Sequence, residues 1–215
     1  MRYFYRRSRW CLPGLCLPLV GVMAFAGFVC FSPARAALPV GSQAPMFDAQ
    51  ATRNGSEFSF HLADALRKGP VVLYFYPAAF TRGCTMEAHD FASAMDQYTA
   101  LGAMVIGVST DDMPTLDRFS VSEGHGRFPV ATDPQGRIAR MYDSRLPLLN
   151  RANRTSYVIA PDGRVIYAYS ALSPDGHVTH TLDALRQWRA AQGRASPVSL
   201  PASTPATTTP SATTP

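Results

Sequence analysis

The sequence predicts one α/β domain in which helices flank a central mixed β-sheet. Continuous apolar runs at residues 70–76 and 103–108 are typical of strands that are buried on both faces. Segments with helical spacing of apolar residues follow these runs. Two further strand patterns, at 155–160 and 165–170, are joined by the turn at 161–164. Alternating strands and helices indicate an α/β fold, and the hairpin makes part of the sheet antiparallel.

The elements are expected in a definite order along the chain. The strand at 70–76 leads into a helix that starts near Cys84 and stops before Gly102. On that helix, apolar residues recur at helical spacing: Ala88, Phe91, Met95, Tyr98 and Leu101. The remaining helices are predicted at 113–122, 135–142 and 178–191. The domain is expected to span 38–192, and we assign no separate element to its first part.

Residues 1–36 have the pattern of a secretory signal peptide. Four arginines in the first nine residues precede a charge-free apolar stretch at 11–31, and Ala34-Arg35-Ala36 offers a cleavage site with small flanking residues. The alternative is an uncleaved membrane anchor. Two prolines shorten the unbroken apolar core and favour cleavage. We therefore expect an exported protein, periplasmic or secreted, which is held at the membrane only if the leader stays in place.

The charge of the chain comes from this leader. The whole chain carries a formal net charge of +5, but all 15 acidic residues and 15 of the 20 Lys and Arg residues follow residue 36. The remainder is neutral, so we expect no nucleic-acid partner. The sequence has no phosphate-binding glycine loop and no metal-ligand spacing of histidines, so we expect no cofactor and no metal. The last segment, 195–215, is rich in Pro, Thr, Ser and Ala and is predicted to be disordered.

Cys84 is the only cysteine outside the leader. An exported domain that relied on disulfides would carry an even number of cysteines, so a lone thiol is either a buried small hydrophobe or a nucleophile. The thiolate is the reactive form, and an ordinary thiol of pKa about 8.5 is only slightly ionised near neutral pH. A helix N-terminus stabilises the anion by at most ~2 kcal/mol, whereas a guanidinium about 4 Å away contributes roughly 4 kcal/mol. A nucleophile here therefore requires an arginine, which position alone does not name.

Two separated motifs resemble the peroxiredoxin family. The pattern Pro77-x3-Thr81-x2-Cys84-x2-Glu87 is similar to the peroxiredoxin active-site motif. Its surroundings look like the bacterioferritin-comigratory branch of the alkyl hydroperoxide reductase and thiol-specific antioxidant proteins. Downstream, Arg154 at the start of the strand before the hairpin resembles the arginine of that family. The resemblance covers 38–192 and implies a thioredoxin-like fold.

The resemblance implies a role for each matched residue. Cys84 would be the peroxidatic nucleophile and become a sulfenic acid. Arg154 would stabilise the thiolate and the departing oxygen, and Glu87 would orient that arginine. Thr81 would hydrogen-bond the thiolate or peroxide, and Pro77 would shield the sulfur from water. The structural alternatives are a helix cap for Thr81, a first-turn acid for Glu87 and a surface arginine for Arg154.

One departure from the family pattern decides the expected cycle. Many members of the branch carry a resolving cysteine five residues after the first, where this chain has His89. We therefore expect a one-cysteine peroxidase for hydrogen peroxide or organic hydroperoxides. Its reductant would be an external thiol or a thioredoxin- or glutaredoxin-like protein, and the chain a monomer or homodimer. The alternatives are a thiol–disulfide oxidoreductase, disfavoured because Glu87 replaces the second cysteine of Cys-x-x-Cys, and a non-catalytic thioredoxin-like redox-sensing or binding module.

Overall fold

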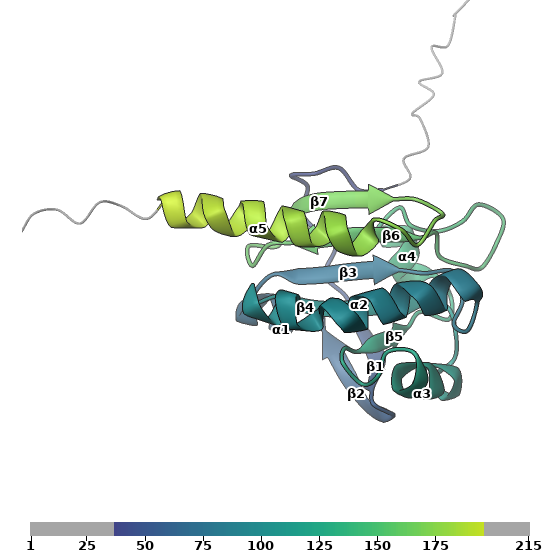
Figure 1. Ribbon diagram of the computed structural model, residues 1–215. Coiled ribbons are helices and arrows are strands. Elements are labelled where there is room, and N and C mark those ends of the chain that lie inside the picture. The colour runs from purple at the N-terminus through teal and green to yellow at the C-terminus, as the bar shows by residue number, and fades with distance from the viewer. Residues whose placement is uncertain (1–36, 196–215) are drawn as a thin grey trace, which may run out of the picture. The chain divides into compact units, whose positions relative to one another are not determined.

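The computed structural model describes residues 37–195, so the predicted leader at 1–36 and the tail at 196–215 lie outside the described residues (Figure 1). The elements in chain order are β1 (Asp48–Arg53), β2 (Ser56–His61), α1 (Leu62–Lys68), β3 (Val71–Phe75), α2 (Arg82–Ala100), β4 (Met104–Ser109), α3 (Met113–Ser122), β5 (Val130–Thr132), α4 (Arg137–Met141), β6 (Thr155–Ile159), β7 (Val165–Ser170) and α5 (His177–Ala195). In this part of the chain, no helix is both long enough and apolar enough to span a bilayer.

The strands form one mixed sheet in the order β2-β1-β5-β4-β3-β6-β7. β3, β4 and β5 run parallel, whereas β6 pairs antiparallel with both β3 and β7. β1 pairs antiparallel with β2 and β5. The predicted α/β class with a mixed sheet and a late hairpin is confirmed.

The central strand β3 divides the core into two layers. All five of its side chains are buried, and successive side chains point to opposite faces of the sheet. Val72 and Tyr74 pack with side chains of α2, α3 and α5, while Leu73 and Phe75 pack with those of α1 and α4. Figure 1 shows α2 and α5 on the same side of the sheet. The continuous apolar run of β3 is therefore explained by helices on both faces.

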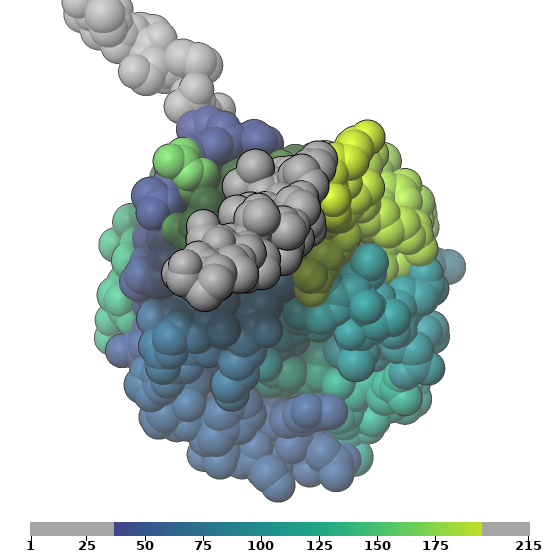
Figure 2. Space-filling model, turned by 90° about the vertical axis from the view of Figure 1, so that its left-hand side faces the viewer, coloured from purple at the N-terminus to yellow at the C-terminus, as the bar shows by residue number. Residues whose placement is uncertain are grey.

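Polar contacts hold α5 against the end of α2. The Arg189 Nε donates to the carbonyl of Leu101 at 2.9 Å, and an Arg186 guanidinium nitrogen donates to the Gln97 side chain at 2.7 Å. Figure 2 shows this end of the domain, with the yellow last turns of α5 beside teal residues of α2. Gly102 ends α2 with a φ of 65°, as its position in the sequence predicts. At its other end, α5 begins with His177, whose Nδ1 lies 3.6 Å from Oε1 of Glu87 in α2.

The sequence-based prediction missed four elements: β1, β2, α1 and β5. The β1–β2 hairpin turns at Asn54-Gly55, with φ of 52° and 73°, and Asn-Gly is a strong signal for this turn. β2 exposes most of its side chains and buries only Phe60, so it has no apolar run. β5 has three residues and α1 seven, which is too short for a clear periodic pattern.

Candidate active site

Cys84 lies in the first turn of α2, directly after the loop that leaves β3. Thr81 precedes the helix, and its carbonyl accepts the first helical hydrogen bond from the Thr85 N–H at 2.9 Å. The loop is tied to the end of β4, because the Ala79 N–H donates to the carboxylate of Asp111 at 2.7 Å. Cys84 is 1 % exposed. The fold therefore presents a buried sulfur at a helix N-terminus, where the electrostatic field favours an anion.

The structure brings Arg154 to this sulfur. Arg154 immediately precedes β6, and the antiparallel pairing of Thr155 with Phe75 puts it at the same sheet edge as the end of β3. Its Nη2 donates to Sγ of Cys84 at 3.4 Å, and its Nε donates to the carbonyl of Leu172 at 3.0 Å. The guanidinium is almost fully buried. The arginine that the nucleophile requires is thus present, and it is not a surface residue.

Glu87 holds the third nitrogen of the guanidinium. It follows Cys84 by one helical turn, is fully buried, and accepts a hydrogen bond at Oε2 from Nη1 of Arg154. Burial raises the pKa of Glu87 to about 8, against the opposing effect of Arg154. The orienting contact expected from the family resemblance is therefore formed in this structure.

The expected roles of Thr81 and Pro77 are not visible in this structure. The Thr81 hydroxyl donates to the carbonyl of Ala78 at 3.0 Å, and it makes no side-chain cap of α2. In this structure the Thr81 hydroxyl therefore bonds to the loop and not to the sulfur. Pro77 is half-buried and follows Tyr76, which packs in the same cluster as Cys84. The contact of Thr81 with a substrate and the shielding by Pro77 remain predictions.

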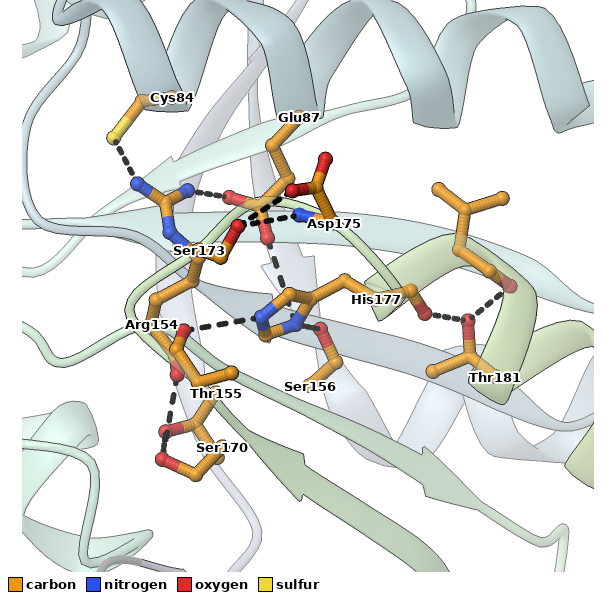
Figure 3. A network of polar contacts seen from close by, with 12 residues as sticks. Cys84, Glu87, Arg154, Thr155, Ser156, Ser170, Ser173, Asp175, His177 and Thr181 are labelled. Atoms are coloured by element: carbon orange, nitrogen blue, oxygen red, sulfur yellow. Dashed lines mark hydrogen bonds and ion pairs between the residues drawn. The ribbon is translucent and has the colours of Figure 1, made fainter.

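His177 is a buried neighbour that the sequence pattern did not reveal. Figure 3 shows it behind Arg154 and Glu87 as seen from Cys84. Its Nδ1 lies 2.8 Å from Oγ of Ser156 and 3.6 Å from Oε1 of Glu87. Burial lowers the pKa of His177 to about 4. His177 comes from α5, whereas Arg154 and Ser156 lie at the start of β6, so no local spacing in the sequence links the histidine to the other two.

His89 occupies the position at which many members of the branch have a cysteine. Its Nε2 lies 3.0 Å from Oε2 of Glu123, and its ring stacks on that of His125 with centroids 5.1 Å apart. These contacts fasten the second turn of α2 to the segment that follows α3. Among residues 37–195, no group of three or more acidic, histidine or cysteine side chains is arranged to hold a metal ion.

The mixed sheet and the buried cysteine at a helix start define a thioredoxin-like protein in which a cysteine is paired with an arginine. Residues 40–168 match the sequence profile described as the AhpC/TSA family. The chain belongs to this family and is a peroxiredoxin of the Bcp type.

Named relatives agree with this assignment. Over 193 residues the chain is 30% identical to Peroxiredoxin Q of rice chloroplasts (Oryza sativa subsp. japonica), covering 81% of this chain and 87% of the relative. It is 29% identical over 126 residues to Peroxiredoxin Bcp of Xanthomonas campestris pv. campestris, covering 54% and 76%. The crystal structure of Peroxidoxin BcpB from Mycobacterium tuberculosis superposes with a TM-score of 0.65 at 30% identity, covering 70% of this chain and 97% of that one.

Proposed function

We propose that this chain is a thiol-dependent peroxidase that reduces a hydroperoxide at Cys84. The observation that carries the proposal is the 3.4 Å hydrogen bond from Arg154 to the buried sulfur. A guanidinium donor stabilises a thiolate more than a thiol, because the charge-assisted hydrogen bond is the stronger one. The same donor faces the place where negative charge develops on the departing oxygen.

The reaction balances with the sulfur as the only electron donor of the first step. The Cys84 thiolate attacks the terminal oxygen of the hydroperoxide, so an S–O bond forms and the O–O bond breaks. Two electrons pass from sulfur to the peroxide, and the departing hydroxide or alkoxide takes a proton and leaves as water or alcohol. Cys84 is left as a sulfenic acid.

An external thiol completes the cycle. The first thiol attacks the sulfenic sulfur, releases water and forms a mixed disulfide, and a second thiol displaces Cys84 in its reduced form. Within residues 37–195 Cys84 is the only cysteine, so this part of the chain supplies no resolving thiol. The reductant is therefore a small thiol or a thioredoxin- or glutaredoxin-like protein.

Each matched residue has a place in this scheme. Arg154 binds the thiolate and the leaving oxygen, and Glu87 fixes the guanidinium. Thr81 keeps the loop in place through Ala78, and its hydroxyl oxygen remains able to accept from the O–H of a hydroperoxide. Pro77 limits the access of water.

Exposed apolar side chains border this region of the domain. They are Phe80 in the loop before α2, Met86 on its first turns, and Leu172, whose carbonyl accepts from Arg154. Such side chains suit the alkyl part of an organic hydroperoxide. We propose further that the leader exports the chain to the periplasm or the exterior, and that the domain acts as a monomer or homodimer.

Peroxide consumption tests the proposed function. The chain beginning at Ala37 and its Cys84→Ser variant are compared with hydrogen peroxide and with cumene hydroperoxide, using dithiothreitol, glutathione and thioredoxin as reductants. We expect catalytic consumption only by the unmodified chain. Equal activity in the two proteins would overturn the proposal. Oxidation of Cys84 once, without turnover under any reductant, would favour a redox-sensing module.

A further inference from the structure

Behind the arginine, Glu87 and His177 form a pair of buried titratable side chains. Both side chains are fully buried, and Glu87 Oε1 lies 3.6 Å from Nδ1 of His177 (Figure 3). Glu87 Oε1 has no hydrogen-bond partner within the described residues. An unsatisfied buried carboxylate oxygen costs free energy. A proton on this oxygen or on a group beside it lowers that cost.

The contacts of the imidazole determine where its proton lies. Nε2 of His177 is 3.2 Å from the carbonyl of Ala171, and a carbonyl oxygen only accepts, so Nε2 carries a hydrogen. Nδ1 faces Oγ of Ser156 at 2.8 Å. A hydroxyl either donates or accepts, so Ser156 keeps its hydrogen bond whether Nδ1 is bare or protonated. Oε1 of Glu87 lies beyond hydrogen-bond distance of Nδ1, so a proton passes between the two groups only when they approach more closely than 3.6 Å.

The charges of the site favour such a proton. A Cys84 thiolate, an ionised Glu87 and the Arg154 guanidinium together carry one net negative charge, although all three side chains are buried. Burying an uncompensated charge is costly. One proton on Glu87 or His177 makes the cluster neutral, and the positive charge of Arg154 then balances the thiolate alone.

We propose that the Glu87–His177 pair carries one proton, on Oε1 or on Nδ1, while Cys84 is ionised, and that His177 is thereby a positioning residue for the reactive thiolate. This inference rests on the proposed peroxidase function and deepens it. The polar contacts of His177 are with Ser156, Ala171 and Glu87, and not with the sulfur. It acts through Glu87 and Arg154.

The direction of each pKa shift agrees with this placement. Burial raises the pKa of Glu87 to about 8 and lowers that of His177 to about 4, so at neutral pH the proton belongs mainly to the carboxyl. Titratable groups from every surrounding element face the pair. They are Cys84 and Asp90 on α2, Tyr74 and Tyr76 at the end of β3, Arg154 before β6, Tyr169 on β7 and His180 on α5. Arg154 is the only permanent cation among them, so loss of the shared proton leaves the thiolate uncompensated.

The proposal predicts a fall in reactivity on the alkaline side. When the pair loses its proton, the Glu87 carboxylate cancels the charge of Arg154, and the departing oxygen loses its counter-charge. The second-order rate constant for oxidation of Cys84 should therefore decline above about pH 8, where the carboxyl ionises. A purely structural His177 would leave the shape of the pH profile unchanged.

Three variants test this in single-turnover oxidation by hydrogen peroxide, followed by quenching and mass spectrometry across the pH range. In Glu87→Gln the alkaline decline should disappear, because the amide cannot ionise. In His177→Gln it should move to lower pH by about one unit, because the protonated carboxyl then loses the acceptor Nδ1 that it could approach. The variant His61→Gln makes the same chemical change at an exposed position on the edge strand β2, and it should keep the original profile.

The outcomes separate this inference from the proposed function. No oxidation of Cys84 at any pH would overturn the peroxidase itself. Oxidation with an alkaline decline that stays the same in Glu87→Gln, or a uniform loss of rate in His177→Gln without a shift, would overturn only the shared proton.

Nitrogen-15 NMR of the histidines in the unmodified chain gives a decision even if a variant does not fold. We expect a hydrogen on Nε2 of His177 throughout, and a change at Nδ1 that has the midpoint of the alkaline decline. An Nδ1 signal that stays constant through that decline would also overturn the proposal.

Discussion

A β-carbon placed on Gly83 would lie 3.0 Å from Nη2 of Arg154, the nitrogen that donates to Sγ of Cys84. Gly83 lies inside the first turn of α2, with no left-handed φ that would require glycine. Glycine in a helix costs about 1 kcal/mol relative to alanine. Glycine at this position therefore lowers the stability of the helix but permits the close approach of the guanidinium.

Gly83→Ala should lower reactivity without lowering stability. The added methyl group displaces Nη2 by a few tenths of an ångström, and we expect the rate of Cys84 oxidation to fall by about three- to tenfold, since charge-assisted hydrogen bonds weaken with misalignment. The free energy of unfolding should stay constant or rise by up to about 1 kcal/mol. Stopped-flow oxidation and urea unfolding measure the two effects. Gly193→Ala is the matched control, because nothing lies within 4 Å of its new carbon. An unchanged rate in Gly83→Ala would show that the contact is not limiting.

Arg154→Met should remove most of the reactivity of the sulfur. Loss of a charge-assisted hydrogen bond worth ~1.5–3 kcal/mol corresponds to a fall of about 10- to 100-fold in the oxidation rate. Arg154→Lys should restore little, because an ammonium cannot serve Cys84, Glu87 and the Leu172 carbonyl at once, as the guanidinium fork does. Alkylation and peroxide kinetics measure the effect, and circular dichroism excludes unfolding. Full activity in the lysine variant would show that charge alone suffices.

Thr81→Val and Thr81→Ser separate the hydroxyl from the shape of the side chain. The hydroxyl donates to the Ala78 carbonyl and so holds the loop before α2. Valine keeps the volume but loses this bond, and we expect about tenfold slower oxidation and a stability loss of about 1 kcal/mol. In Thr81→Ser we expect the oxidation rate and the stability to stay close to those of the unmodified chain. Equal rates in the two variants would contradict a role for the hydroxyl.

The Glu87–His177 pair should give the folded domain a plateau of stability between about pH 4.5 and pH 6.5. The folded state depresses the pKa of His177 from 6.5 to about 4, so this group makes stability rise with pH inside that window. It raises the pKa of Glu87 from 4.5 to about 8, so that group makes stability fall as pH rises through its window. Where the windows overlap the two effects cancel.

Above that plateau only the Glu87 effect remains. We expect a loss of about 2 kcal/mol between about pH 6.5 and pH 8. Urea unfolding at about pH 6 and about pH 8 measures it, and Glu87→Gln should abolish the difference. A difference that is the same in both proteins would assign the decline to other groups.

Most of the sheet could be predicted from the sequence, because buried strands and amphipathic helices have a recognisable pattern of apolar residues. The sequence pattern predicts β3, α2 and the β6–β7 hairpin to within a few residues. The β1–β2 hairpin escaped because β2 buries only Phe60, although its Asn54-Gly55 turn is a readable signal. Short elements such as β5 depend on their neighbours in the sheet, which a linear pattern does not reveal.

The residues of the site also differ in whether the sequence predicts them. Cys84 and Glu87 lie one helical turn apart, and only the second motif of the family predicts Arg154. Ser156 and His177 approach from β6 and α5, and their types are common in ordinary positions. Their contact with the site is a product of three-dimensional packing, so only the folded structure could reveal it.

The contacts of His89 have a consequence for how this domain is used. Because the ring is fastened to Glu123 and His125, the helix that carries Cys84 is braced against the segment after α3. Residues 37–195 contain no second cysteine, so no disulfide within this part of the chain requires the helix to move. An external thiol must instead reach a sulfur that is only 1 % exposed, so we expect the rate of recycling to depend on how the reductant gains access to Cys84.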